Sequence, residues 1–447
     1  MAAEQRGRTR RFLTLTLILC MSITAGVVGS RGVAAAGDAY QKLDIFSDVL
    51  STIQNTYVED AEVDDLVYGA IEGMLNTLDP HTSFLRPDAY QAMKVDTSGQ
   101  FGGLGIEISY RDHVLTVVAP MEDTPASRAG IEAGDRILAI EGEYTEELGL
   151  MEAVKRMRGP RGTDVTITVM RDGWPSPKDL TLTREVIQVR SVSSEMLDHG
   201  IGYIRVAQFQ ERTTRDLDQA LKELEEKDLQ GLVLDFRNNP GGLLDQAIGI
   251  SDLFLDEGLI TYTEGRLPNT KQEFRASQGT DRTYPVVVLI NGGSASASEI
   301  VAGALQEHKR AIVMGTPSFG KGSVQTIIPL RDGSALRLTT AKYYTPNGRS
   351  IQAKGIDPDI IVEQATIKET LASSMHRREA DLERHLGGGV TIRPAGSDED
   401  GEQDEESAED EHRLHPSSDR ADDYQLQRAV DLLRGYSMFS TLKKVVR

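Results

Sequence analysis

Short continuous apolar runs, typical of buried strands, alternate along the chain with segments in which apolar residues recur every three or four positions. The runs lie at 202–206, 231–236, 286–290 and 311–314. The segment between the first two has helical spacing, at Leu217, Ala220, Leu221 and Leu224. Strands that alternate with helices predict an α/β core, which we place at residues 187–370.

The pattern before this core predicts two other regions. Residues 37–97 have helical spacing, which predicts a helical region with an apolar face available for docking or dimerisation. Residues 98–186 instead form a separate unit of strand-like segments, opened by a glycine-rich stretch at 101–105. Within it, residues 126–140 predict a short helix, a turn and a strand.

The two ends of the chain differ from the rest. Four arginines precede the uncharged apolar run 12–29, and small residues follow it, which is the layout of a signal peptide over residues 1–36. We therefore expect an exported, periplasmic protein. An uncleaved inner-membrane anchor is the alternative, because the apolar run is just long enough to span a membrane.

An acidic segment lies near the other end. It covers 387–422, and 10 of the 15 residues 397–411 are Asp or Glu, which predicts a disordered linker or a partner-binding tail. Residues 423–447 regain helical spacing and predict a C-terminal helix that docks on the core or on a second subunit.

Charge and cysteine content argue against a nucleic-acid partner, a disulfide and a bound metal. The chain has 49 basic and 69 acidic residues, and its net charge of −20 argues against a nucleic-acid partner. The only cysteine, Cys20, lies in the N-terminal apolar run, so the remaining chain is expected to have no disulfide. No His/Cys cluster has metal-ligand spacing, and we expect neither a metal nor a cofactor.

Candidate chemistry lies where the strand 286–290 turns into a helix. The turn contains the sequence Ser-Ala-Ser-Ala-Ser-Glu, and unpaired N–H groups at a helix start stabilise an alkoxide or oxyanion. A serine nucleophile needs a base, and Lys321, in a Phe-Gly-Lys-Gly turn, is a better candidate than any histidine. A lysine base must be neutral, so its pKa has to fall by roughly three units from about 10.4. A plain surface charge stays open as the alternative.

The sequence from Gly315 to Lys321 is also similar to the motif of a phosphate-binding loop, G-x-x-x-x-G-K-[ST]. Such a loop needs Ser or Thr directly after the lysine and then a helix. Gly322 follows instead, and the next residues predict a strand. This argues against nucleotide binding.

The serine turn, Lys321 and Gln325 together resemble the carboxyl-terminal processing proteases, also called tail-specific proteases. In that family a lysine lies 25 positions after the nucleophile and a glutamine four positions further. The resemblance therefore implies Ser296 as nucleophile, Lys321 as general base and Gln325 as the residue that orients the lysine. The residues alone do not distinguish Ser296 from Ser294 and Ser298.

The resemblance also assigns residues around the nucleophile. It implies an oxyanion hole formed by the N–H groups of Gly242 and Ala297, and support of the active-site geometry by Asp235, Arg237 and Glu299. A structural ion pair is an equally good interpretation of the Asp-Phe-Arg sequence taken alone. The chain departs from the family at position 240, where proline replaces glycine.

Residues 98–186 resemble a PDZ domain, a module that binds peptide termini as an added strand. The resemblance implies that Gly103, Leu104, Gly105 and Ile106 hold the terminal carboxylate. The fold class implied for the whole chain is multidomain α/β. It combines a crotonase/Clp-protease-like α/β core, an inserted PDZ domain and an N-terminal helical region.

The function implied is an exported serine endopeptidase with a Ser–Lys dyad that cleaves proteins selected by their apolar C-terminal tails. The expected partners are such protein and peptide substrates, a second copy joined through the helical termini, and an activating partner. One alternative is a catalytically silent PDZ scaffold that binds C-terminal peptides. Another, an acyl-thioester hydratase or hydrolase, suits neither the export signal nor the PDZ domain.

Overall fold

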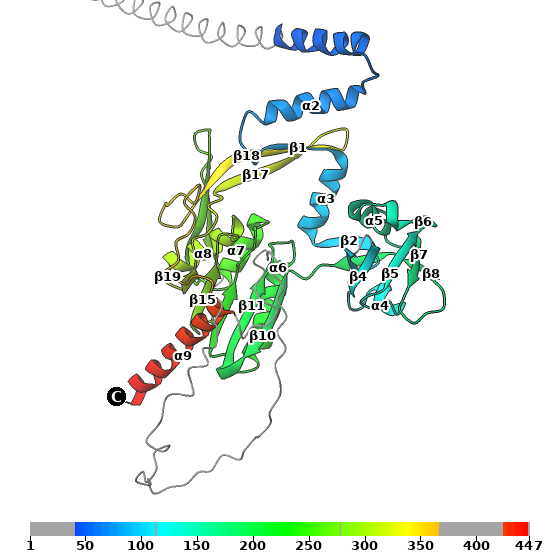
Figure 1. The fold of residues 1–447 in the computed structure, drawn as a ribbon. Coiled ribbons are helices and arrows are strands. Elements are labelled where there is room, and N and C mark those ends of the chain that lie inside the picture. The colour runs from blue at the N-terminus through cyan, green and yellow to red at the C-terminus, as the bar shows by residue number, and fades with distance from the viewer. Residues whose placement is uncertain (1–40, 112–113, 278, 366–422, 446–447) are drawn as a thin grey trace, which may run out of the picture. The chain divides into compact units, whose positions relative to one another are not determined.

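The computed structural model describes residues 41–111, 114–277, 279–365 and 423–445 (Figure 1). The predicted signal segment 1–36 and acidic linker 387–422 lie outside these ranges. By their internal contacts, residues up to 87 together with 327–338 form one unit, and the rest of the chain forms a second.

A mostly parallel six-stranded sheet forms the core of the second unit. Its strand order is β10-β11-β12-β15-β16-β19. All neighbours pair in parallel except β10 with β11. The bounds are β10 Val192–Leu197, β11 Ile201–Val206, β12 Gly231–Asp235, β15 Val286–Ile290, β16 Ala311–Gly315 and β19 Ile360–Ile361. The four apolar runs in the sequence are the four central strands, so the predicted α/β core is present.

Helices cover both faces of this sheet. Because side chains alternate between the faces of a strand, Leu232 and Leu234 of β12 pack on one side and Val233 on the other. The first side meets α6 (Thr213–Glu225), α7 (Leu244–Asp252) and α8 (Ala297–Glu307). The other side meets the C-terminal helix α9 (Tyr424–Val445), which is red in Figure 1.

A second, antiparallel set of strands is interleaved in sequence with the core elements. It contains β13 (Gly258–Gly265), β14 (Gln272–Ala276), β17 (Ser323–Pro329) and β18 (Ala335–Tyr344). The strand β17 begins two residues after Lys321, where a phosphate-binding loop would begin a helix. The structure therefore agrees with the argument against nucleotide binding.

Residues 106–183 form a small β body with its own core. Its strand order is β3-β4-β5-β7-β8, with the two-residue strand β6 (Glu143–Tyr144) paired to β5. The bounds are β3 Ile106–Arg111, β4 Val114–Pro120, β5 Arg136–Ile140, β7 Asp164–Met170 and β8 Lys178–Thr183, with helices α4 Pro125–Arg128 and α5 Leu150–Met157. The chain enters through β2 (Gln100–Gly103) and leaves through β9 (Glu185–Gln188), and these two strands pair antiparallel. This ribbon is what an inserted domain requires.

The first unit is mainly helical, as its sequence predicts. It contains a helix over 41–56 and α2 (Val63–Leu75), and α3 (Pro87–Ser98) begins at its boundary. The structure adds a strand that the helical pattern did not indicate, β1 (Ser83–Leu85), which pairs with Ala335–Arg337 of β18. Its partner is about 250 positions away, so no local pattern could reveal it.

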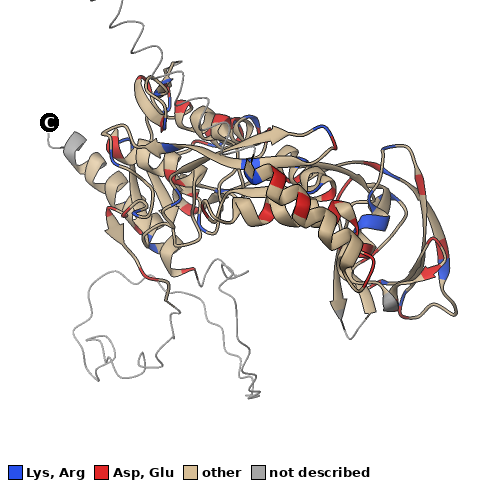
Figure 2. Ribbon diagram, turned by 90° about the horizontal axis from the view of Figure 1, so that it is seen from above, with Lys and Arg blue, Asp and Glu red and all other residues tan. Residues whose placement is uncertain are grey.

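Acidic and basic residues are interspersed along the described ribbon (Figure 2). Within the described ranges, no helix has both the length and the apolar character needed to cross a membrane.

Candidate active site

The serine turn connects β15 to α8, and the three serines in it have different roles. Ser294 Oγ donates to Phe236 O at 2.8 Å, and Ser298 Oγ donates to Asn239 O at 3.0 Å. Both are fully buried. Ser296 is 7% exposed and has a backbone that L residues rarely adopt, with φ 56° and ψ −109°. Such a strained turn between strand and helix is typical of a presented nucleophile.

The lysine loop is fixed from both of its ends. Lys321 Nζ donates to Gln325 Oε1, and Gln325 Nε2 donates to Ser323 Oγ at 2.9 Å. Gly322 lies so close to the main chain of Gln352 that an added Cβ would be 2.3 Å from its nitrogen. Glutamine thus orients the lysine head group, while the flanking glycine permits the close backbone contact.

The buried carboxylate of Glu299 joins the serine turn to the lysine loop. Its Oε2 atom accepts hydrogen bonds from the backbone N–H groups of Ser296 at 2.8 Å and Lys321 at 2.9 Å. Its Oε1 atom accepts from Gly320 N at 2.7 Å and Ser318 Oγ at 2.5 Å. One carboxylate oxygen therefore holds the main chains of the proposed nucleophile and base within two hydrogen-bond lengths.

The glycine loop after β12 lies against the serine turn. A Cβ on Gly241, whose φ is 98°, would be 2.7 Å from Ala295 O and 2.9 Å from Ala297 N. Gly242 has φ 146°, and a Cβ there would meet the carbonyl oxygen of Phe209 at 2.2 Å. Neither position tolerates a side chain, so the loop brings backbone rather than side chains to the site.

The N–H groups of Gly242 and Ala297 both belong to this junction. Neither has a hydrogen-bond acceptor within the part of the chain that the structure describes. Asn239 fixes the loop: its main-chain oxygen accepts from Ala295 N at 3.0 Å, and its Oδ1 accepts from Gly241 N at 2.9 Å. The sequence interpretation gave no role to Asn239 or Gly241. Their place in the glycine-containing loop directly after a buried strand was the only available signal.

Within the described ranges, the hydrogen bonds and ion pairs of Asp235 and Arg237 go to groups other than Ser296 and Lys321. Arg237 Nη2 donates to Asp235 Oδ2 at 2.7 Å, and Tyr203 OH donates to the same atom at 2.8 Å. On its other edge the guanidinium contacts Asp423 and Gln425, at the start of α9. Their support of the active site, implied by the resemblance, stays a prediction, and any such effect has to pass through the loop that follows Arg237.

Burial and neighbouring charges shift the pKa values of two groups that are bonded to Asp235 and Arg237, Tyr203 and Asp423. Burial, and then the nearby Asp235 carboxylate, raise the pKa of the Tyr203 hydroxyl. Burial favours a higher pKa for Asp423 as well, but the hydrogen bonds and charge of Arg237 outweigh it and lower that pKa. Asp423 is therefore held as a carboxylate against the guanidinium.

The β body carries a groove at its glycine-rich entry. A pocket of about 100 Å³ is lined by Gly103–Ile106, by Ile108 of β3 and by Val154 and Met157 of α5. Gly105 has φ 76°, and its carbonyl accepts from Met121 N at 2.8 Å. All four residues that the resemblance assigns to carboxylate binding therefore line one groove between a strand and a helix, and its walls are apolar except for Arg158.

Comparison with known proteins identifies the family. A model of peptidase family S41 matches residues 200–362, a PDZ domain model matches 116–171, and a model described as the activating protease CtpB N-terminal domain matches 27–89. The carboxy-terminal-processing protease of Bartonella bacilliformis is 45% identical over 404 residues, which cover 89% of each chain. The chain belongs to the carboxy-terminal processing proteases.

This chain is also similar to two other C-terminal processing proteases. The carboxy-terminal processing protease CtpA of Bacillus subtilis is 35% identical over 359 residues, covering 78% of this chain and 76% of its own. Among solved structures, the photosystem II D1 C-terminal processing protease is 31% identical, with a TM-score of 0.42 over 71% of this chain and 92% of its own.

Family membership decides three predictions from the sequence. The family resemblance, the multidomain α/β fold with a PDZ domain, and serine-type peptidase activity are confirmed. The scaffold alternative is not favoured. The individual catalytic residues, export to the periplasm, self-association and an activating partner stay predictions.

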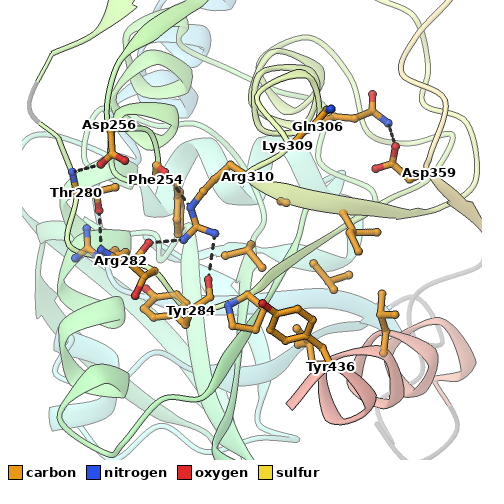
Figure 3. A pocket seen from close by; sticks show the side chains of 18 residues that line it. Phe254, Asp256, Thr280, Arg282, Tyr284, Gln306, Lys309, Arg310, Asp359 and Tyr436 are labelled. Carbon is orange, nitrogen blue, oxygen red and sulfur yellow. Dashed lines mark hydrogen bonds between the residues drawn. The ribbon is translucent and has the colours of Figure 1, made fainter. Parts of the chain in front are cut away.

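A pocket much larger than the groove of the β body is found away from the predicted catalytic residues. A pocket of about 620 Å³ lies beside α9 and contains none of the predicted catalytic residues (Figure 3). Arg310 in its wall donates to the main-chain oxygens of Phe254, Tyr284 and Arg282. Within the described ranges, no group of three or more His, Cys, Asp or Glu residues is arranged to hold a metal ion.

Proposed function

We propose that this carboxy-terminal processing protease hydrolyses peptide bonds with Ser296 as nucleophile and Lys321 as general base. The observation that carries the proposal is the shared acceptor, Glu299 Oε2, which binds the main chains of both residues. The strained backbone of Ser296 and the hydrogen bond from Lys321 Nζ to Gln325 support the same assignment.

In the proposed reaction, the neutral amine of Lys321 takes the proton of Ser296 as Oγ attacks the substrate carbonyl. The oxyanion that forms is stabilised by the N–H groups of Gly242 and Ala297, and the loss of one such donor costs about 3 kcal/mol in other serine proteases. The lysine then gives its proton to the departing amine, which leaves an acyl-enzyme on Ser296. A water molecule that loses its proton to Lys321 attacks the ester, and Lys321 returns this proton to Ser296 Oγ as the acyl–oxygen bond breaks, which frees the carboxyl product and restores the neutral lysine.

We further propose that the PDZ groove selects substrates by an apolar C-terminal tail. A tail would add as a strand beside β3, with its carboxylate on the N–H groups of Gly103–Ile106. The apolar lining from Ile108, Val154 and Met157 supports a preference for an apolar last residue.

The test is digestion of an unfolded protein that ends in an apolar tail, with a second copy of the substrate whose terminal carboxylate is a carboxamide. Wild type is expected to cut the free-tail substrate faster, and Ser296→Ala and Lys321→Ala are expected not to cut. Lys342→Ala is a matched control, since this lysine is exposed. Cleavage by Ser296→Ala would refute the dyad, and equal rates on the two tails would refute the tail selection.

A further inference from the structure

The guanidinium of Arg237 is completely satisfied inside the protein, and half of its hydrogen bonds go to two residues at the start of the C-terminal helix, Asp423 and Gln425. Nη1 and Nη2 donate to Asp423 Oδ1 at 2.8 Å and Oδ2 at 2.6 Å. Nη1 also donates to Gln425 Oε1 at 3.1 Å. Nε and Nη2 donate to Asp235 at 2.7–3.1 Å. All five N–H groups of the guanidinium are thus in use.

These groups are deeply buried. The side chains of Arg237, Asp235 and Asp423 are 3%, 0% and 5% exposed. Buried charges of this kind keep their geometry only while every partner is present, because a buried charge that has lost its partner is strongly destabilising. Arg237 therefore keeps its position only while the start of α9 is in place.

The residues after Arg237 lead directly to the active site. Asn238 has a positive φ of 56°, and its N–H donates to Asn291 Oδ1 at 2.9 Å, in the turn that contains the serines. Asn239 follows with its bond from Ala295 N, and Gly241 then lies against Ala297 N. The main chain from the guanidinium to the proposed oxyanion hole is only a few residues long and is bonded along its length.

Asp423 has a second role that makes it experimentally useful. It is the residue before α9, and its Oδ1 accepts from Leu426 N at 3.2 Å, so it caps the helix as well as binding Arg237. Asparagine caps helices about as well as aspartate. Asp423→Asn therefore preserves the helix start while it removes the charge and one of the two acceptors that face Arg237.

We propose that Asp423 is a positioning residue of the protease, which acts through Arg237 to hold the loop 238–242 at the nucleophile. This inference rests on the proposed function of Ser296 and Gly242. It makes the docked C-terminal helix a part of the catalytic apparatus rather than a structural appendage. A small displacement of an oxyanion donor lowers turnover without changing how a distant tail binds.

The first test measures kcat and KM for the free-tail substrate in full-length Asp423→Asn. We expect kcat to fall roughly tenfold or more, with KM for the tail unchanged. Asp431→Asn is the matched control, because Asp431 lies on the same helix in an exposed ion pair with Arg428 and should keep wild-type kcat. In a double-mutant cycle, Arg237→Gln combined with Asp423→Asn should be no slower than Arg237→Gln alone, because Asp423 acts through Arg237.

A purely structural role predicts a different result. Leu433→Ala removes a buried side chain of α9 without touching Arg237, so it lowers the melting temperature but should leave kcat unchanged in the folded enzyme. If kcat in Asp423→Asn equals wild type, or if Leu433→Ala lowers kcat to the same extent, the positioning role is refuted.

A second readout does not depend on turnover. Hydrogen exchange of a peptide covering 236–243 should be faster in Asp423→Asn than in Asp431→Asn, and equal exchange would also refute the proposal. Cleavage by Ser296→Ala would overturn the proposed function, whereas wild-type turnover in Asp423→Asn overturns only the positioning role.

Discussion

Replacing Glu299 by glutamine should damage this protease out of proportion to the size of the change. The carboxylate has two oxygens, and each accepts two hydrogen bonds: Oε2 from the serine turn and the lysine loop, and Oε1 from the lysine loop alone. Glutamine has one carbonyl oxygen, and its NH2 group is a donor. In Glu299→Gln, one pair of donors therefore keeps an acceptor while the other pair faces an N–H group.

The magnitude follows from burial. Glu299 is fully buried, so water does not replace the lost acceptor. Each buried donor without an acceptor costs about 1–3 kcal/mol, and two of them should lower the free energy of unfolding by about 2–6 kcal/mol. If the main chains of Ser296 and Lys321 separate by about 1 Å, turnover should fall about 100-fold.

The assay combines thermal unfolding with kcat on the free-tail substrate, measured well below the melting temperature. Glu307→Gln is the matched control: Glu307 lies on the same helix, and its carboxylate accepts a bond from Asn347 N at 2.7 Å outside the active site. The control should lose less stability than Glu299→Gln, because the amide oxygen of glutamine can still accept the bond from Asn347 N and only the long contact of Glu307 with Arg349, at 3.6 Å, is weakened. If Glu299→Gln matches this control in both stability and kcat, the carboxylate does not hold the site together.

Three further predictions follow from the geometry. Gly241→Ala should abolish turnover, because its Cβ would overlap Ala295 O at 2.7 Å, whereas Gly292→Ala, with no atom within 4 Å, should keep it; kcat distinguishes them. The pKa of Asp423 is lowered in the folded protein, so its contribution to stability is complete above its unfolded pKa of about 3.9 and is lost as pH falls through the lower folded value. Melting temperatures of wild type and Asp423→Asn should therefore converge below about pH 4, and a constant difference would contradict this sign. Val154→Arg should raise KM for an apolar tail by filling the PDZ groove, while Val186→Arg, at an exposed position of β9, should not; a kcat loss with unchanged KM in Val154→Arg would argue against selection in the groove.

Two residues, Glu299 and Asn239, connect the loops of the proposed active site in different ways. Glu299 joins the serine turn to the lysine loop through backbone N–H groups, and Asn239 joins the glycine loop to the same turn. Neither depends on a side chain that reacts. The geometry of the proposed active site is therefore set mainly by main-chain contacts, which explains why glycines at 241, 242 and 322 cannot carry a Cβ.

The sequence alone determined the central strands of the α/β core and the C-terminal helix, since hydrophobic spacing is a property of neighbouring residues. The runs at 231–236 and 286–290 became adjacent parallel strands, and the spacing at Leu426 and Leu433 became the buried face of α9. The serine turn and the spacing to Lys321 and Gln325 were sufficient to identify the family. Ser296 could be chosen from the three serines only through that resemblance, because their different hydrogen-bond partners are not visible in sequence.

Only the tertiary structure decided which residues meet. Arg237 and Asp423 are 186 positions apart, and β1 pairs with a strand about 250 positions away. No periodicity encodes such partners, because they follow from how helices and strands pack around the two faces of the sheet. For the same reason, the sequence could name Asp235 and Arg237 as an ion pair but could not show that the C-terminal helix completes it.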